Sequence, residues 1–226
     1  MENEQQIQLR RNNHGKRICK IVLTGGPCAG KTTAMNESAD KIKRLYNDKW
    51  QAFVVSEASS FLYTGRVQRS ELSDEQVNQW QMDVLTTILQ LESVYDNIAE
   101  REQSKDTMII CDRGGMDPKA YTNGEEIWKD ILNKLDVDED KIFARYDAVI
   151  QMHTAPREYY STVNNPYRRE TYEVAEIINA RYEQLWNTHP YYFVVENFDA
   201  YNQSDGWNQK SAKTFEIIEK FLSSQE

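Results

Sequence analysis

The apolar positions of this chain form two kinds of pattern that alternate along it. Short runs rich in apolar and β-branched residues predict buried strands at 18–25, 52–55, 108–111, 147–154 and 191–197. The stretches between these runs carry apolar residues three or four positions apart, which is the spacing of a helix with one buried face. Strands that alternate with helices predict an α/β fold with a parallel five-stranded sheet and helices on both faces.

The longest helical stripe begins after Ser73. Ser73 and Gln76 match a capping box, and the apolar positions over 77–98 recur every three or four residues. We interpret this stripe as core packing, and the alternative is a face that binds a partner. The segment 58–72 before it is expected to be largely a loop. Further stripes predict helices at 35–42, 125–135, 174–185 and 215–222.

The charge balance limits the partners that this chain is expected to bind. Among its 226 residues, 36 acidic side chains outnumber 27 Lys and Arg, for a net charge of −9. Such a chain is not expected to bind nucleic acid, which requires clustered cations. Residues 1–16 are polar and without periodicity, so we expect a flexible tail followed by one domain over 17–226.

Cysteine usage and hydropathy indicate the compartment. Cys19, Cys28 and Cys111 are not spaced like a metal site or a disulfide framework, which fits a reducing environment. No apolar run is long enough for a membrane span, and the N-terminus has no apolar signal core. These features predict a cytoplasmic protein.

Residues 25–33 read GGPCAGKTT and match the phosphate-binding P-loop, G-x-x-x-x-G-K-[ST]. A predicted strand precedes the motif and a predicted helix follows it, which is the setting that a P-loop requires. Its glycines let backbone N–H groups turn toward phosphate oxygens at a helix N-terminus. Lys31 is expected to reach the β- and γ-phosphates of ATP or GTP, and the Thr32 hydroxyl to hold Mg²⁺. The expected nucleotide-binding residues are Gly25, Gly26, Pro27, Cys28, Ala29, Gly30, Lys31, Thr32, Thr33 and Arg157.

Two acidic residues end predicted strands. Glu57 follows the strand 52–55, and Asp112 follows the strand 108–111. Ligands of open α/β sheets bind at the carboxyl ends of the strands, so both positions are candidates for the site. P-loop proteins place a carboxylate that binds Mg²⁺ where Asp112 stands. The alternative is that Asp112 only ends its strand in a turn.

The long polar loop at 155–171 is a candidate lid. It contains Arg157, Arg168 and Arg169, which would neutralise charge during phosphoryl transfer. The alternative is a solvated basic loop. The segment 58–72 contains Arg66 and Arg69, which face either a substrate or only solvent. Arg66 is the candidate for binding the substrate.

Two further motifs resemble those of switch GTPases, but their spacing excludes that class. The sequence DRGG at 112–115 fits D-x-x-G, and NKLD at 133–136 fits N-K-x-D. A switch GTPase needs two helices and two strands between these motifs, and the segment 116–132 holds about one helix. We therefore interpret NKLD as a coincidence.

Several segments together resemble P-loop kinases of nucleosides and nucleotides. The segments TGGPCAGKTT, CDRGGMDPKAY and NNPYRRETYEVAEIINARYEQLWNTHPYYFVVEN are similar to a P-loop family of AAA type. That family includes the ribosylnicotinamide kinase domain of bacterial NAD regulators and nucleotide-binding proteins of the TRPL translocation defect type. The resemblance covers most of the chain between 18 and 197.

This resemblance implies a nucleoside-kinase-like fold, Mg²⁺-nucleotide binding and transfer of the γ-phosphoryl group to a small hydroxyl acceptor. Glu57 resembles the carboxylate that takes the acceptor proton, and Arg113 the arginine beside the transferring phosphate. Asp117 and Tyr121 resemble substrate-side residues. The acceptor, the choice between ATP and GTP and the oligomeric state stay open.

Three functional classes follow from these observations. A small-molecule kinase is favoured by Glu57 and by the DRGGMD segment. A nucleotide-binding regulator would use the same P-loop to drive a conformational change. An assembled ATPase machine is disfavoured, because no helical small domain follows the core.

Overall fold

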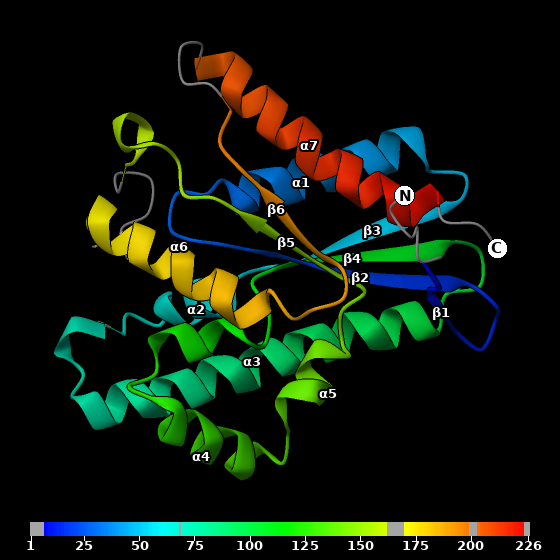
Figure 1. Ribbon diagram of the computed structural model, residues 1–226. Helices are drawn as coiled ribbons and strands as arrows, with labels where there is room; N and C mark the ends of the chain where they lie inside the picture. The colour runs from blue at the N-terminus through cyan, green and yellow to red at the C-terminus, as the bar shows by residue number, and fades with distance from the viewer. Residues whose placement is uncertain (1–6, 68, 162–169, 199–202, 224–226) are drawn as a thin grey trace.

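The structure of this chain is a computed structural model that describes residues 7–67, 69–161, 170–198 and 203–223. Its sheet contains five parallel strands: β2 (Arg17–Thr24), β3 (Trp50–Val55), β4 (Asp106–Asp112), β5 (Ala148–Met152) and β6 (Tyr192–Val195). They lie in the order β3-β4-β2-β5-β6 (Figure 1). The parallel five-stranded sheet predicted from the apolar runs is therefore confirmed.

Helices cover both faces of this sheet. They are α1 (Lys31–Leu45), α2 (Ala58–Tyr63), α3 (Asp74–Glu100), α4 (Glu125–Leu135), α5 (Glu139–Phe143), α6 (Tyr172–Trp186) and α7 (Gln203–Ser223). Short 3-10 turns lie at η1 (Arg69–Glu71), η2 (Asp117–Tyr121) and η3 (Arg157–Tyr159). In Figure 1, α1 and α7 lie on one side of the sheet, and α3, α4, α5 and α6 lie on the other.

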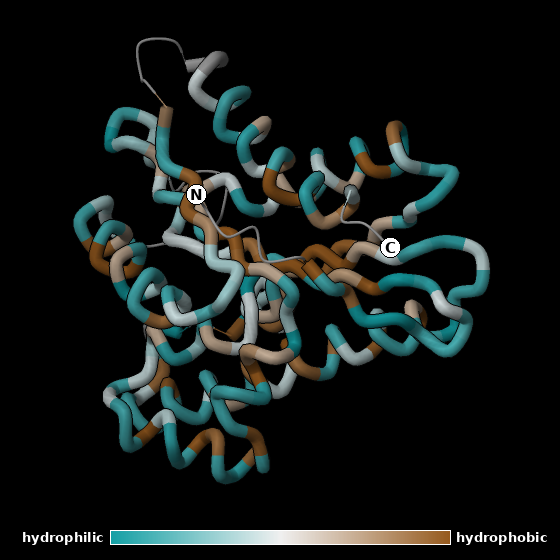
Figure 2. Tube along the Cα trace, turned by 45° about the vertical axis from the view of Figure 1, so that its right-hand side comes forward, coloured by the Kyte–Doolittle hydropathy of each residue, from teal (hydrophilic) through white to brown (hydrophobic). Residues whose placement is uncertain are grey.

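The alternation of side chains along β2 produces the two apolar cores. Ile21 and Leu23 pack toward α1 and α7, whereas Ile18 and Val22 pack toward α3, α4 and α6. Successive side chains of a strand point to opposite faces, so a strand that is buried on both faces must be apolar throughout most of its length. Figure 2 shows the most hydrophobic part of the trace in the central strands.

The order of the strands creates a crevice at the carboxyl end of β2. This strand lies between β4 and β5. The connection that leaves β2 runs to β3, and the connection that leaves the neighbouring β4 runs to β5, in opposite directions along the sheet. Leu23 pairs with Asp112 and Thr24 with Gln151 in the parallel registers. The loop that follows β2 and the carboxylate that ends β4 therefore share one edge of the sheet.

The expected flexible tail over residues 1–16 is wrong for residues 9–12. Arg10–Arg11 form the short strand β1, which pairs antiparallel with β2. Leu9 is buried in the core, and the Asn12 amide donates hydrogen bonds to the carbonyls of Ala99 and Glu102 at 2.9 and 2.8 Å. These contacts are with residues distant in sequence, so periodicity within the segment gave no sign of them.

The helix α3 begins with the predicted capping box. The Gln76 N–H donates to Ser73 Oγ at 3.3 Å, and the Ser73 N–H donates to Gln76 Oε1 at 2.9 Å. Core packing is confirmed for Val84 and Ile88, whereas Ile98 at the end of the stripe is 42% exposed. The segment 58–72 is less of a loop than expected, because α2 and η1 lie within it, and α5 was also missed. These elements have three to six residues, too few for a recognisable period.

Within the described residues, no helix is both long enough and apolar enough to cross a membrane.

Candidate functional site

The P-loop connects β2 to α1, in the strand–loop–helix setting that the sequence predicts. Two of its glycines adopt positive φ angles, +125° at Gly25 and +86° at Gly30. A Cβ atom at Gly25 would lie 2.1 Å from the Met152 carbonyl oxygen, and one at Gly30 would lie 2.3 Å from the Trp207 ring. Glycine is therefore needed at both positions for backbone conformation and for space.

Lys31 lies at the first position of α1 and is buried. Its Nζ donates hydrogen bonds to the carbonyls of Gly25 and Gly26, both at 3.0 Å. Burial and the nearby Arg113 guanidinium lower the pKa of Lys31 to about 8. The ammonium is thus held inside the P-loop by two backbone carbonyl oxygens.

Thr32 and Asp112 meet at the predicted position of the metal. The Thr32 hydroxyl donates to Asp112 Oδ2, and Asp112 Oδ1 is buried without a hydrogen-bond partner in the described residues. Burial, with a contribution from Glu57, raises the pKa of Asp112, although Lys31 opposes this effect. A buried carboxylate oxygen without a partner beside a hydroxyl suits Mg²⁺, which takes few protein ligands and keeps several waters. The residues present therefore fit the ion.

Glu57 and Arg113 form an ion pair at the carboxyl edge of the sheet. Arg113 Nε donates to Glu57 Oε1 at 2.6 Å, and the hydroxyls of Ser59 and Ser60 donate to the same carboxylate at 2.9 and 2.6 Å. Burial alone would raise the pKa of Glu57, but the charges of Arg113 and Lys31 outweigh it and lower the pKa to about 2. Glu57 is therefore an anion at neutral pH.

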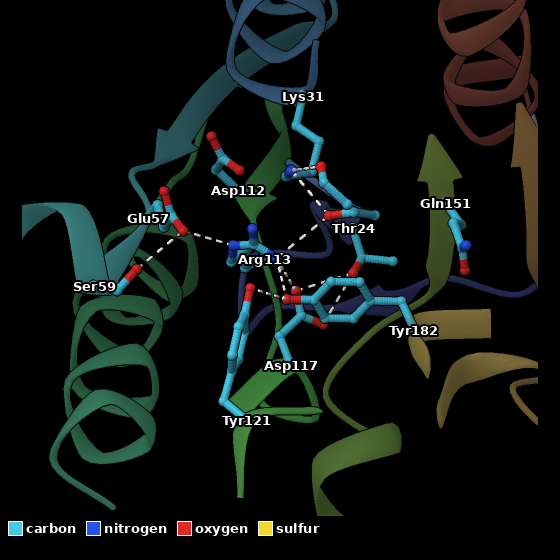
Figure 3. Close-up of polar contacts among 12 residues, drawn as sticks. Thr24, Lys31, Glu57, Ser59, Asp112, Arg113, Asp117, Tyr121, Gln151 and Tyr182 are labelled. Carbon is cyan, nitrogen blue, oxygen red and sulfur yellow. Dashed lines mark hydrogen bonds and ion pairs between the residues drawn. The ribbon is translucent and has the colours of Figure 1, made fainter. Parts of the chain in front are cut away.

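Arg113 lies at the centre of a wider polar group, which Figure 3 shows between Glu57 and Asp117. Its backbone has a φ of +76°, an uncommon conformation for a residue with a side chain. Its Nη1 donates to the Tyr182 hydroxyl, and that hydroxyl lies 3.3 Å from the hydroxyl of Tyr121. The Arg113 guanidinium therefore contacts Glu57 on one side and Tyr182 on the other.

Asp117 is almost fully buried, at 2% exposed. It accepts hydrogen bonds from the Thr24 hydroxyl at 2.9 Å and from the Trp186 indole N–H at 2.7 Å. Burial raises the pKa of Asp117, while Arg113 acts in the opposite direction. Asp117 was expected on the substrate side. Its carboxylate instead contacts mainly other protein groups, and these contacts hold the segment after β4 in place.

A second set of buried side chains contacts the segment that follows β4. The Gly115 N–H donates to the Tyr146 hydroxyl at 2.7 Å, and this hydroxyl donates to Glu92 Oε1 at the same distance. Arg145 and Lys20 balance the fully buried Glu92 at 2.8 and 3.4 Å. A buried charge is tolerated only when it is paired in this way, and the pairing here connects α3 to the loop that carries Arg113.

The P-loop, the Thr32–Asp112 pair and the Glu57–Arg113 pair line one pocket. Its volume of about 810 Å³ is within the range of sites that hold small molecules. The predicted site residues that line it are Pro27, Cys28, Ala29, Gly30, Lys31, Thr32, Thr33, Glu57, Asp112, Arg113, Asp117 and Tyr121. Gly25 and Gly26 are not among the lining residues, but their carbonyls accept hydrogen bonds from the Lys31 ammonium.

Two of the predicted arginines that the structure describes do not line this pocket. Arg66 is exposed and does not line the pocket. Arg157 also lies outside the pocket lining, and it pairs with Glu173 at 2.5 Å and stacks on Tyr172. The expected contact of Arg157 with the nucleotide stays a prediction. The lid residues Arg168 and Arg169 lie outside the described residues.

Sequence reasoning missed several pocket residues, which come from distant segments. Tyr63 and Trp80 stack with ring centroids 5.3 Å apart. Arg69, which the sequence placed in the same loop as Arg66, lies over the Tyr121 ring at 4.9 Å. On the other side, Lys210 donates to the His153 carbonyl, and burial lowers its pKa to about 7. Trp80 belongs to the stripe that we interpreted as core, so one helix face serves both the core and the pocket.

Comparisons with known proteins agree with this fold. Residues 20–203 match the model of a family described as AAA domain. Thymidylate kinase from Ehrlichia chaffeensis has a similar structure, with a TM-score of 0.61 at 14% identity over 89% of this chain and 98% of that one. The NadR protein in complex with NAD and AMP-PNP is also similar, with a TM-score of 0.57 at 12% identity over 92% of this chain.

The match to NadR covers 50% of the NadR chain, so this chain spans about half of its length. No curated protein matches this sequence. At sequence identities of 14% and 12%, the similar structures establish the fold alone. The family match is a match of the sequence, and it covers most of this chain. This chain belongs to the AAA domain family whose model it matches, and it has the fold of the P-loop kinases.

Proposed function

We propose that this chain binds a Mg²⁺-nucleotide, ATP or GTP, and transfers its γ-phosphoryl group to a small hydroxyl-bearing acceptor, such as a nucleoside or a nucleoside-like metabolite. One observation carries the proposal. The P-loop residue Lys31, the Thr32–Asp112 pair and the Glu57–Arg113 pair all line the same pocket. Phosphoryl transfer requires mainly positioning and charge stabilisation, and this group of side chains supplies both.

Each residue has a distinct task in the proposed reaction. Lys31 leaves the carbonyls of Gly25 and Gly26 to contact the β- and γ-phosphates. Thr32 and Asp112 hold Mg²⁺, which neutralises charge on the phosphates when it is bound. Arg113 offsets the charge that develops on the transferring group.

Glu57 orients the acceptor. The acceptor oxygen forms a bond to the γ-phosphorus while the bond from that phosphorus to the β–γ bridging oxygen breaks, and the nucleoside diphosphate leaves. The hydroxyl donates a hydrogen bond to Glu57, and its proton moves to that carboxylate late in the step. With a pKa of about 2, Glu57 is a weak base, so positioning is the larger part of its role.

A nucleotide-dependent regulator is the second candidate, and one observation favours it. Glu57 already accepts hydrogen bonds from Arg113 and two serines. If the only role of this carboxylate is to hold these side chains together, the protein needs no molecule that accepts a phosphoryl group. In that case the Glu57–Arg113 pair would couple the nucleotide to the conformation of the segment after β4.

A direct test separates the two candidates. Purified protein is incubated with Mg²⁺-ATP or Mg²⁺-GTP and a panel of nucleosides and related hydroxyl metabolites, and mass spectrometry measures phosphorylated products. A kinase yields a product whose formation depends on both donor and acceptor. Nucleotide binding by calorimetry without any phosphorylated product would favour the regulator instead.

The metal site gives a further prediction. Replacing Asp112 by asparagine should raise the Mg²⁺ concentration that supports half-maximal nucleotide binding by about ten-fold or more, because a neutral amide is a poorer ligand for a hard cation. The measurement is a Mg²⁺ titration at fixed nucleotide concentration. The exposed Asp130→Asn variant on α4 is the matched control and should behave as the wild type. An unchanged Mg²⁺ requirement in Asp112→Asn would remove Asp112 from the metal site.

A further inference from the structure

The part of the pocket beyond Glu57 contains a cation that no described carboxylate neutralises. Arg69, in the turn η1, lines the pocket and is half-buried. Within the described ranges it forms no ion pair, although Glu170 also lines the pocket. Arg113 differs in this respect, because Glu57 and Asp117 pair with it. Partial burial of a guanidinium without a counter-ion costs desolvation free energy. The position of Arg69 in a pocket therefore indicates that a ligand supplies the negative charge.

The geometry of Arg69 suits recognition of an anion. Its guanidinium carbon lies 4.9 Å from the centroid of the Tyr121 ring, so the face of the group packs against an aromatic ring. A guanidinium held by its face keeps its N–H donors around its edge, and that edge matches the two oxygens of a carboxylate or phosphate.

The surroundings of Arg69 are apolar and aromatic. Tyr63 and Trp80 stack at 5.3 Å with an interplanar angle of 30°, and Val84 and Ile88 complete this wall of the pocket. Such a wall packs against a planar ring, and it lowers the local dielectric, which strengthens a contact between charges.

A chain of contacts places Arg69 relative to the reacting groups. Arg69 packs on Tyr121, the hydroxyls of Tyr121 and Tyr182 lie 3.3 Å apart, and Tyr182 accepts a hydrogen bond from Arg113. Arg113 in turn pairs with Glu57, and Figure 3 shows Glu57, Tyr121 and Tyr182 around Arg113. Arg69 is thus three side chains away from the carboxylate that would face the acceptor hydroxyl, at the other end of a small molecule.

We infer that the acceptor carries an anionic group, a carboxylate or a phosphate, remote from its reacting hydroxyl, and that Arg69 binds this group. The inference rests on the proposed function, and it narrows the acceptor class to anionic, ring-containing molecules. Arg69 is then the residue that selects the acceptor, and Arg66, which lies outside the pocket lining, has no part in the selection.

Matched pairs of ligands test this inference by binding alone. One pair is nicotinic acid riboside and nicotinamide riboside, which differ by a carboxylate on the ring. The other pair is thymidine 3′-monophosphate and thymidine, which differ by a phosphate distant from the 5′-hydroxyl. Each ligand is titrated by calorimetry into the protein saturated with Mg²⁺ and a non-hydrolysable ATP or GTP analogue.

The wild type should bind the anionic member of at least one pair about ten-fold or more tightly than the neutral member. The Arg69→Gln variant should reduce this preference to about two-fold or less, without weakening the neutral ligand. Arg66→Gln, which removes the same charge from a pocket-remote position, should keep the full preference. The pair that shows the effect identifies the anion as carboxylate or phosphate.

Two results would overturn the inference. One is the absence of a preference for the anionic member in both pairs, absence of binding included. The other is a preference that survives Arg69→Gln in a variant with the melting temperature of the wild type. The proposed function fails on a different measurement, the lack of phosphorylated product, because the binding assay requires no transfer.

Discussion

Replacement of Glu57 by glutamine should slow phosphoryl transfer by about 10²–10⁴-fold and leave nucleotide affinity nearly unchanged. The amide keeps the size of the side chain, but it removes the anion that receives the acceptor proton and pairs with Arg113 at 2.6 Å. The donor phosphates contact Lys31 and the P-loop, so their affinity does not depend on this carboxylate. Steady-state kinetics and calorimetric titration of the nucleotide measure the two quantities separately.

The ion pair requires a control for stability. Loss of the Glu57 charge leaves Arg113 with a weaker partner, so thermal melts must accompany the kinetics. Glu71→Gln, in the neighbouring turn η1, removes the same charge from an exposed position and should have no effect on transfer. A Glu57→Gln protein of normal stability and wild-type rate would end the assignment of a catalytic role to Glu57. No product from either protein, with unchanged nucleotide binding, would favour the regulator.

Replacement of Lys31 by alanine should weaken Mg²⁺-nucleotide binding by about ten-fold or more and slow transfer by about 10²–10³-fold. The ammonium is buried at the first turn of α1, where it is the cation nearest to the P-loop carbonyls. Lys43→Ala, on the exposed face of the same helix, is the matched control. Equal nucleotide affinities of wild type and Lys31→Ala would show that this P-loop does not bind phosphate.

The same lysine predicts how nucleotide affinity depends on pH. Its pKa is lowered from 10.5 to about 8, so the free protein carries mostly neutral Lys31 above that pH. Phosphate binding requires the ammonium, and the protein must then take up a proton. Titration of Lys31 should therefore leave the nucleotide affinity constant below about pH 7.5. Above pH 8 the same titration should lower the nucleotide affinity by up to about ten-fold per pH unit. Lys31→Ala should lack this decline, whereas a parallel decline in both proteins would assign it to another group.

Local patterns were sufficient to predict the elements around the P-loop. The five parallel strands, the capping box at Ser73 and the helix Glu125–Leu135 all depend on residues within a few positions of each other. The strand–loop–helix setting of GGPCAGKTT and the position of Asp112 at a strand end have the same local origin. Periodicity and motif spacing report on such short-range relationships, and here the structure agrees with them.

The pairing of side chains across the pocket required the tertiary structure. No spacing rule joins Glu57 to Arg113 or Asp117 to Trp186, which lie 56 and 69 residues apart. The sequence likewise placed Arg66 and Arg69 in one loop and gave no reason to prefer Arg69. The turn η1 brings Arg69 over Tyr121, whereas Arg66 is exposed.

The sequence by itself therefore determined the sheet, the P-loop and the two carboxylates at the strand ends, because strand and helix formation depend on near neighbours in the chain. The tertiary structure decided which charges are neutralised within the protein and which are left for a ligand. That distinction depends on burial and on distances between atoms from separate elements. Lys210 and Trp207 of α7 join the pocket beside Lys31 for the same reason, since only packing of α7 against α1 brings them to the site.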